Sequence, residues 1–323
     1  MEPKNFEITS SDWSKLRNLR SHFLSETLSV GTDYWDSSEL LELYHQTFAQ
    51  RIGWKWDAVL NENRVKNLVF KQKKVTLLDY GCGTGMAAEK MINFLGSECL
   101  LKVQLWDRSQ RAREFAQVQL GKKFPALCIE SSNQLGDPRE PLIVCLSHVL
   151  NEISKAKLGE VIDLISQANF VFWVEPGTSD VSNQLIWLRK KMLQEMTVVS
   201  PCPHQGDCGM ASLSNQNHWC HFFASPPTDV FHSSFWRQFS RELSIDLRSL
   251  PTSYLVLEKG RLPVESSHSR VIGRPRIYKG YGKFLLCNDK GVGEVRFLEK
   301  KQKELLKLYK HDVFCKEIEF NED

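Results

Sequence analysis

Three glycines at alternate positions follow a short apolar segment near residue 80. The segment Val75–Tyr80 is apolar enough to form a buried strand, and residues 86–95 have the pattern of a helix that ends at Gly96. Between them stand the glycines at 81, 83 and 85. Glycine adopts positive φ angles without steric cost, and a helix N-terminus offers unpaired N–H groups and partial positive charge. This strand, turn and helix predict a binding site for a ligand that carries a carboxylate or a phosphate.

The glycine spacing differs from the dinucleotide-binding pattern, whose third glycine stands three residues after the second. Here Asp79 precedes Gly81, Gly83 and Gly85. That arrangement resembles the first motif of class I S-adenosylmethionine (SAM) methyltransferases, in which the loop contacts the methionine part of SAM. The alternative is a glycine turn with a structural role alone.

A second acidic residue lies where such a fold needs one. Residues 101–106 predict the next strand, and Asp107 follows it, 22 positions beyond Gly85. A carboxylate at this place in a doubly wound sheet accepts hydrogen bonds from a ribose. The alternative is that Asp107 caps the helix that begins near Gln110.

Composition and the N-terminus limit the class of protein. The 323 residues are 41% hydrophobic and 25% charged, which is typical of soluble globular proteins. No apolar run approaches the ~20 residues of a membrane helix, and residues 1–12 resemble neither a signal peptide nor a transit peptide. We therefore expect a protein that stays in the compartment where it is made, does not contact membranes and is a monomer when free.

Strands alternate with helices between residues 74 and 259, and this predicts a mainly parallel sheet that binds ligands at the carboxyl ends of its strands. Residues 197–200 and 253–258 predict a final antiparallel pair. Residues 1–70 have helical patterns and predict an N-terminal layer. We therefore expect three segments, which are a helical region (1–70), a SAM-binding domain (71–259) and a small β-module with a last helix (260–323).

Nine cysteines in a chain expected to be intracellular argue against disulfides. Four stand in apolar runs as small hydrophobes (Cys82, Cys99, Cys128 and Cys145), and Cys315 has no evident role. The remaining four are Cys202, Cys208, Cys220 and Cys287, of which three lie in the polar loop 200–223. Thiolates bind zinc and iron–sulfur clusters. No C-x2-C pair is present, which weakens the case for a zinc ribbon. Nearby histidines at 204, 218 and 221 leave a mixed zinc site open. The residues therefore predict a metal without fixing its identity.

The C-terminal segment is basic. Between Lys259 and Lys310 stand 14 Lys and Arg residues against 5 Asp and Glu. Such a segment on a mildly acidic body is typical of proteins with phosphate-rich partners, although a solvated charged surface is the plain alternative. The predicted RNA-binding residues are Arg270, Arg274, Arg276 and Lys279.

Several motifs together resemble one family, the methyltransferase-like assembly factors of the mitochondrial small ribosomal subunit (methyltransferase-like protein 17 type) and their bacterial relatives. The motifs are Tyr34-Trp35, the Arg-Ile-Gly-Trp-Lys-Trp-Asp run at 51–57, the glycine loop, Leu-Asn-Glu at 150–152, Glu-Pro-Gly-Thr at 175–178, Pro-Cys-Pro-His at 201–204 with Cys208, Trp-Cys-His-Phe at 219–222, Ser253-Tyr254 and Cys287. The chain departs from the family pattern at Gly209, at His218 and at Ser147-His148.

The resemblance implies a class I SAM methyltransferase (Rossmann-like) α/β fold with an N-terminal helical layer, a cysteine-rich metal loop between the last two strands and a small basic β-module. It further implies a four-iron four-sulfur (4Fe-4S) cluster held by the four cysteines, with zinc as the alternative. The implied partners are the small ribosomal subunit and its ribosomal RNA (rRNA), and the implied role is maturation of that subunit. Because residues 1–12 do not resemble a transit peptide, we expect a bacterial, cytoplasmic member of the family; a eukaryotic member would belong in the mitochondrial matrix.

The catalytic residues of a methyltransferase are less evident. Neither an Asp/Asn-Pro-Pro-aromatic motif nor a nucleophilic Pro-Cys pair follows the fourth predicted strand, and Cys202 belongs to the metal set. The candidates are His148, Asn151, Glu152 and Glu175, although Asn151 can cap a helix and Glu175 can end a strand. Two hypotheses follow, an RNA methyltransferase and an assembly factor that uses SAM and the cluster structurally without turnover.

Overall fold

A computed structural model describes residues 8–24, 35–70, 74–131, 140–262, 267–310 and 316–319. Tyr34 of the first family motif and Cys315 lie outside these ranges. The chain forms two compact units, residues 1–174 with 224–250 and residues 175–223 with 251–323, and each is described by itself. This division differs from the three segments expected from sequence, because residues 175–223 group with the C-terminal segment.

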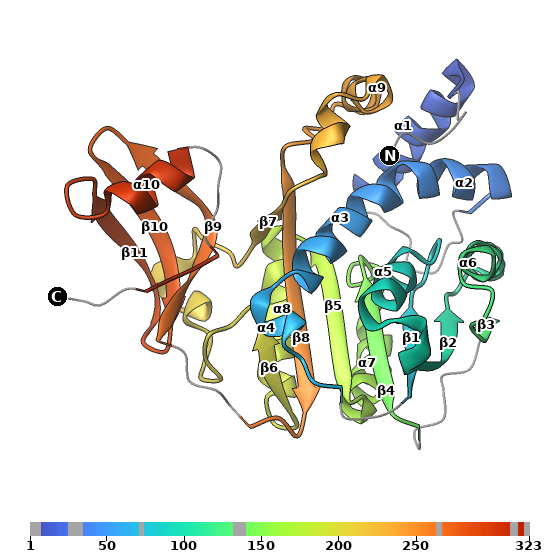
Figure 1. Cartoon of the computed structure of the whole chain (residues 1–323), viewed down its shortest axis with the longest axis horizontal. Helices are drawn as coiled ribbons and strands as arrows, with labels where there is room; N and C mark the ends of the chain where they lie inside the picture. Colours follow the sequence, from blue (N-terminus) through green and yellow to red (C-terminus); the bar gives the residue numbers. More distant parts are fainter. Residues whose placement is uncertain are drawn as a thin grey trace. The chain divides into compact units, whose positions relative to one another are not determined.

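The first unit is built on parallel strands in the order β3-β2-β1-β4-β5 (Figure 1). The strands are β1 (Val75–Tyr80), β2 (Leu100–Trp106), β3 (Ile129–Ser131), β4 (Leu142–Ser147) and β5 (Phe170–Pro176). In the register, Asp79 of β1 pairs with Leu105 of β2 and with Cys145 of β4. The carboxyl ends of these strands therefore meet at one edge, and the predicted doubly wound sheet is confirmed.

Helices connect these strands. They are α5 (Met86–Leu95), α6 (Gln110–Lys123) and α7 (Lys155–Gln167), with a short 3-10 turn η1 (Ser97–Cys99) before β2. Gly96 ends α5 at φ 84°, as its sequence predicts. The side chains of Ser109 and Ser154 accept hydrogen bonds from the first-turn N–H groups of Ala112 and Lys157, so serines cap α6 and α7.

An N-terminal helical layer belongs to the same unit, as predicted. It contains α1 (Ser10–Leu24), α2 (Ser38–Gln46), α3 (Phe48–Leu60) and α4 (Asn63–Lys66), together with the 3-10 turn η4 (Thr228–Phe231) and α9 (Ser234–Leu243). These helices share an apolar core in which the rings of Trp54 and Trp236 lie 4.9 Å apart. Gly53 brings α3 against α5, since a Cβ there would lie 2.8 Å from the sulfur of Met86. Trp54 is 7% exposed and Trp56 fully buried, so these indoles pack the core and do not form a surface for nucleic-acid bases.

The second unit contains β6 (Met196–Ser200) and β8 (Leu250–Lys259), which pair antiparallel as predicted. A short strand, β7 (Phe222–Ala224), also pairs with β8, and α8 (Ser179–Met192) precedes β6. The loop between β6 and β7 holds two 3-10 turns, η2 (Gly209–Ala211) and η3 (Leu213–Asn215).

The C-terminal part of this unit is a four-stranded antiparallel sheet, orange to red in Figure 1, with strand order β11-β10-β9-β12. Its elements are β9 (His268–Tyr278), β10 (Tyr281–Asn288), β11 (Gly291–Leu298), α10 (Lys303–Lys310) and β12 (Glu317–Glu319). Phe284 and Phe297 of the sheet pack with Leu306 and Tyr309 of α10. Within the described ranges, no helix combines the length and the apolar content needed to span a membrane.

Candidate functional site

The glycine loop after β1 adopts the conformation that its sequence predicts. Gly81, Gly83 and Gly85 have φ angles of 74°, 51° and 80°, a region that favours glycine. A Cβ at Gly81 would lie 2.2 Å from Cγ1 of Val149, and one at Gly85 would lie 3.1 Å from Leu120, so both positions need glycine for packing. A Cβ at Gly83 would meet nothing within 4 Å. Gly83 is therefore where the loop faces open space.

Asp107 ties the glycine loop to the end of β2. Its Oδ2 accepts a hydrogen bond from the N–H of Gly83 over 2.9 Å, and its Oδ1 accepts one from the N–H of Ser109 over 2.9 Å. The side-chain cap of α6 comes from Ser109. Helix capping therefore does not explain Asp107, whose carboxylate lies beside the open position at Gly83.

Asp79 is the most unusual group at this edge of the sheet. It is fully buried, and its Oδ2 accepts a hydrogen bond from the N–H of Ala88 over 3.0 Å. Its Oδ1 is buried without a hydrogen-bond partner. Burial, with a smaller contribution from the nearby Asp107, raises the pKa of Asp79 to about 7. An unsatisfied carboxylate oxygen beside a glycine loop fits a ligand that carries an ammonium group.

The residue after β4, His148, is held in a strained backbone conformation. Its φ is 56°, which is uncommon for a residue with a side chain and is often found at functional sites. Its Nε2 lies 3.3 Å from Nζ of Lys55, which is 8% exposed on α3. Burial, with the charges of Lys55 and Arg51, holds the pKa of His148 well below its usual range. The imidazole is therefore neutral near pH 7. Because the ammonium of Lys55 donates to Nε2, the ring carries its proton on Nδ1 and can donate a hydrogen bond from there.

Two residues on α3 complete this corner but were not predicted as site residues. Lys55 contacts His148, and Trp56 donates a hydrogen bond from Nε1 to Oγ of Ser147 over 2.9 Å. The available signal was a lysine between two tryptophans at 54 and 56, because a cation among buried indoles needs a partner.

The other catalytic candidates have different surroundings. Asn151 is exposed, and Glu152 forms an ion pair with Arg108, with 3.1 Å between Oε2 and Nη2. Ser154 caps α7, so Asn151 does not cap it. Glu175 is 1% exposed on β5 and belongs to the second unit. Among the four candidates, His148 is the half-buried one whose side chain is held neutral near pH 7 and whose backbone is strained.

The four predicted metal-binding cysteines come together in the second unit. Cys202, Cys208 and Cys220 line one small cavity with Arg189 and Tyr254. Cys287 on β10 packs in one apolar cluster with Cys208 and Cys220. Burial raises the pKa of the Cys208, Cys220 and Cys287 thiols, and the charge of Cys202 raises all three pKa values further. Residues separated by up to 85 positions in sequence thus share one environment.

Two buried arginines accompany these thiols. Arg189, 2% exposed, donates a hydrogen bond from Nε to Sγ of Cys202 over 3.2 Å and one from Nη2 to the carbonyl of His204 over 2.9 Å. Arg270, also 2% exposed, donates from Nη2 to the hydroxyl of Tyr254 over 3.0 Å and stacks on the Phe222 ring, with 4.5 Å between Cζ and the ring centroid. Both guanidinium groups lower the pKa of the Cys287 thiol.

The thiol loop is fixed to the small sheet beside Cys287. Asn215 donates from Nδ2 to the carbonyls of Gly209 over 2.9 Å and of Val292 over 3.1 Å. A Cβ at Gly209 would lie 2.5 Å from the backbone nitrogen of Val292. The departure from the family pattern at Gly209 therefore has a reason in this chain, since only glycine fits against β11.

The chemistry of this donor set, four thiols with histidines nearby, fits a metal centre. In the part of the chain that the structure describes, no group of three or more His, Cys, Asp or Glu side chains is placed to hold a metal ion. His204 and His221 have separate contacts, His204 through Nε2 with Sγ of Cys287 at 3.6 Å and His221 through Nδ1 with the carbonyl of Trp219 at 3.0 Å.

The four predicted RNA-binding residues divide into a buried one and three exposed ones. Arg270 is buried against Phe222 and Tyr254, so its role is within the fold and a direct phosphate contact is not open to it. Arg274, Arg276 and Lys279 are exposed on β9 and the turn that follows. Arg274 lies over the ring of Phe223, and Arg276 pairs with Glu294.

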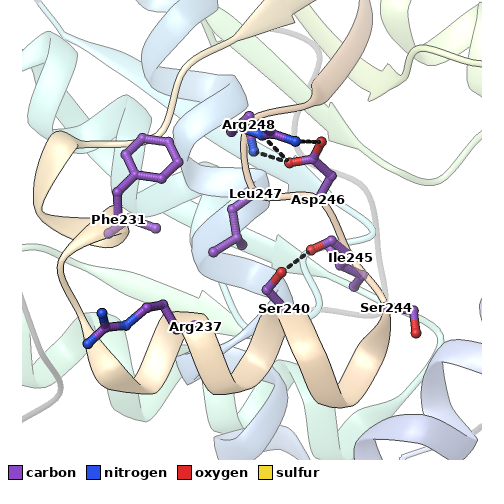
Figure 2. Close-up of a pocket in the computed structure, with 9 residues that line it drawn as sticks. Phe231, Arg237, Ser240, Ser244, Ile245, Asp246, Leu247 and Arg248 are labelled. Atoms are coloured by element: carbon purple, nitrogen blue, oxygen red, sulfur yellow. Dashed lines mark hydrogen bonds and ion pairs between the residues drawn. The ribbon is translucent and has the colours of Figure 1, made fainter.

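A further cavity, of about 540 Å³, lies in the first unit along α9 and the segment after it, and Figure 2 shows the residues that line it. Arg248 is held there by two hydrogen bonds to the carboxylate of Asp246, both of 3.1 Å. Its lining includes none of the predicted site residues.

Comparison of this chain with solved structures finds matches among methyltransferases, of which three follow. A putative RNA methyltransferase from Pyrococcus horikoshii is 10% identical, over 66% of this chain and 85% of its own, with a TM-score of 0.37. A putative class I SAM-dependent methyltransferase from Listeria monocytogenes is 16% identical, over 82% and 72%, with a TM-score of 0.38. A putative tRNA (m1A22) methyltransferase from Streptococcus pneumoniae is 11% identical, over 61% and 69%, with a TM-score of 0.33.

Sequence comparison with the curated proteins finds no match. In contrast, a family model described as mitochondrial small ribosomal subunit Rsm22 matches residues 59–314. This match includes the glycine loop, Asp107, His148 and all four clustered cysteines. Because it covers well over half of the sequence, the chain belongs to the Rsm22 family.

Proposed function

We propose that this protein is a SAM-binding, methyltransferase-like factor that binds small-subunit rRNA during maturation of the small ribosomal subunit. The family description supports the ribosomal part of this proposal. The observation that carries the SAM part is the buried Oδ1 of Asp79, which has no hydrogen-bond partner, at the start of a glycine loop that leaves open space at Gly83. An ammonium group would satisfy the carboxylate of Asp79, while Asp107 offers acceptors for ribose hydroxyls.

A binding experiment tests the SAM site. Isothermal titration with SAM should give saturable binding to the wild-type protein. Gly83→Val fills the open position and Asp107→Ala removes the acceptor, so each should weaken binding at least about tenfold, the effect of losing one charge-assisted hydrogen bond. Gly260→Val is the matched control, because Gly260 also has a positive φ, of 72°, and a Cβ there also meets nothing within 4 Å. Equal SAM affinity in all four proteins would refute the site.

Catalysis is the finer part of the proposal. Bound SAM would supply an electrophilic methyl group. The chain's own contribution would be to orient a base of the RNA at the end of β4, where the neutral imidazole of His148, held by Lys55, can donate a hydrogen bond to it. The proton that the base loses on methylation would pass to solvent. Asn151, Glu152 and Glu175 remain predictions as catalytic residues.

The alternative is a non-catalytic assembly factor in which SAM stabilises the fold of the first unit. Incubating immature small subunits with methyl-labelled SAM separates the two. Label in the RNA that is lost in Asp107→Ala supports the enzyme. Saturable SAM binding without label supports the assembly factor.

We further propose that Cys202, Cys208, Cys220 and Cys287 hold a 4Fe-4S cluster. A single zinc ion holds sulfur ligands at about 2.3 Å and therefore gathers them tightly. In a four-iron cluster each thiolate binds a different iron, and the four cysteines that share this environment supply one thiolate for each iron. Bound there, the cluster would supply a rigid cross-link between the loop and β10, and zinc is the alternative.

The visible absorption spectrum of anaerobically purified protein, with iron, sulfide and zinc assays, decides between these centres. Broad visible absorption with about four iron and four sulfide per chain supports the cluster. A colourless protein with about one zinc supports the alternative. A compact, metal-free protein would refute both. The cytoplasmic location and the monomeric state stay predictions from the sequence.

A further inference from the structure

Two tyrosines form a stacked pair at the tip of the small sheet. Tyr278 ends β9 and Tyr281 begins β10, on either side of the two-residue turn Lys279-Gly280. They are directly paired in the register, and their rings are 4.9 Å apart and inclined by only 18°. The guanidinium of Arg296, from β11, lies 3.9 Å from the centroid of the Tyr281 ring. Three strands thus build one ladder of flat groups.

This ladder does not belong to the core of the sheet. Along β10, Gly282 and Phe284 face α10, since a Cβ at Gly282 would lie 2.7 Å from Leu306. Side chains alternate between the faces of a strand, so Tyr281 and Lys283 point to the opposite face. Tyr278 is 42% exposed. A large aromatic ring that stacks neatly yet packs no core is available for a partner.

Beside the ladder lies a row of like charges. Lys283 pairs directly with Arg276 on one side and with Arg296 on the other. Directly opposed like charges destabilise a sheet. Glu294 offsets part of this repulsion, because it forms ion pairs with Arg276 and, at 2.6 Å, with Lys283. With Lys279 in the turn, four cations and one carboxylate share this surface, which therefore retains a net positive charge that an anionic partner would neutralise.

We propose that this surface, Tyr278, Tyr281, Arg276, Lys283 and Arg296, binds an unpaired stretch of RNA. A splayed base stacks on Tyr278 and extends the ladder, while the cationic row binds the neighbouring phosphates. The aromatic ladder favours single-stranded nucleic acid. The bases of a duplex are already stacked on one another, and a polyanion without bases has no ring that could stack on the tyrosines. The inference rests on the proposed RNA binding and specifies where and how it occurs.

The test uses the full-length protein and fluorescence anisotropy with three labelled probes of equal length. These are an unstructured oligoribonucleotide, its abasic counterpart and an RNA duplex. Tyr278→Ala should weaken binding of the oligoribonucleotide about 5- to 100-fold, the range for loss of one stacked base, and should leave binding of the abasic strand unchanged. Tyr278→Phe should bind as the wild type, because the ring remains. Arg276→Gln should weaken binding of both single strands. It should also reduce the slope of log affinity against log salt concentration by about one.

Leu308→Ala is the control for losing an exposed apolar side chain, since Leu308 is 40% exposed on α10 of the same module. Wild-type affinity of Tyr278→Ala for the oligoribonucleotide would overturn the inference while leaving RNA binding by the protein intact. The inference would also be overturned if Tyr278→Ala lost as much affinity for the abasic strand and the duplex as for the oligoribonucleotide. Full displacement of the oligoribonucleotide by polyglutamate would overturn it too. Either result would show an anion site without base stacking. If the wild-type protein binds none of the probes or the small subunit, the proposed function fails as well.

Discussion

Arg189 donates a hydrogen bond from its Nε to the Sγ of Cys202 over 3.2 Å. Both residues belong to the second unit, and Arg189 is only 2% exposed to solvent. A buried guanidinium needs a compensating negative charge, and metal-bound thiolates at the cysteines around it would supply that charge. The pairing therefore links the position of α8 to the charge state of the cysteine loop.

We predict that Arg189→Met destabilises the metal-loaded protein and lowers its metal content. The variant loses the hydrogen bonds to Cys202 and to the carbonyl of His204, and it leaves the charge of the thiolates uncompensated. Breaking one side of a buried charge pair costs about 3–5 kcal/mol. Thermal unfolding and metal analysis measure both effects. Arg241→Met, at a side chain that is 76% exposed, is the control; an Arg189 variant with full metal content and wild-type stability would contradict the prediction.

The contact between Gly209 and β11 gives a second prediction. In Gly209→Ala, the new methyl group would lie 2.5 Å from the nitrogen of Val292 and 2.9 Å from the carbonyl carbon of Gly291, and neither backbone atom is free to move far. We expect a loss of about 1–3 kcal/mol in the free energy of unfolding, as for other overpacked sites.

Gly293→Ala is the matched control, because Gly293 lies on β11, the strand that Gly209 contacts, and a Cβ there would meet nothing within 4 Å. Denaturant unfolding followed by tryptophan fluorescence compares the two variants. A Gly209 variant that is as stable as the Gly293 variant would show that the loop does not pack on β11 as described.

Much of the fold follows from local signals in the sequence. The predicted strand at 197–200 and the predicted helix at 86–95 agree with β6 and α5 within one residue, because β-branched runs, helical spacing and glycine caps are short-range features. Helix α9 was missed, although Ser233 caps it and Trp236, Phe239 and Leu243 carry its apolar face. This helix lies in a long segment between two predicted strands, so its apolar pattern was not recognised, although the pattern is strong.

The candidate site was predictable in its residue types but not in its contacts. The burial of Arg270 depends on Phe222 and Tyr254, which come from other elements, so its charge alone suggested a surface role. The contact of Lys55 with His148 joins residues 93 positions apart. Such long-range pairs leave no spacing pattern in one sequence, and only the fold reveals them.

The buried carboxyl of Asp79 predicts a pH-dependent stability of the first unit. Its pKa is about 7 in the folded chain against an ordinary value of 3.8, so the folded state binds the proton more tightly than the unfolded state. The protein free of SAM is therefore most stable, as far as this group is concerned, below pH 4, and it loses stability as the pH rises to 7. The loss amounts to about 4 kcal/mol at most.

Asp79→Asn should remove that dependence. Its amide oxygen can still accept from the N–H of Ala88, so at pH 8 we expect the variant to be more stable than the wild type while its SAM affinity falls. Urea unfolding from pH 4 to 8 measures the slope, with Asp163→Asn, at an exposed position on α7, as the control. Parallel pH profiles for wild type and Asp79→Asn would show that the carboxyl is ionised throughout.

The last prediction concerns the ionisation of His148. Burial and the charges of Lys55 and Arg51 depress its pKa, so its imidazole should remain neutral at pH values where an ordinary histidine gains its proton. In Lys55→Met the nearest cation is lost, and the pKa of His148 should rise toward its ordinary value. Histidine ring signals in NMR spectra, assigned with His148→Asn and followed from pH 5 to 8, measure this shift. Lys66→Met, at an exposed lysine on α4, is the control. If methyl transfer depends on His148, the acidic limb of the pH–rate profile should move upward in Lys55→Met and stay in place in Lys66→Met; an unchanged profile would assign the Lys55–His148 contact to the fold alone.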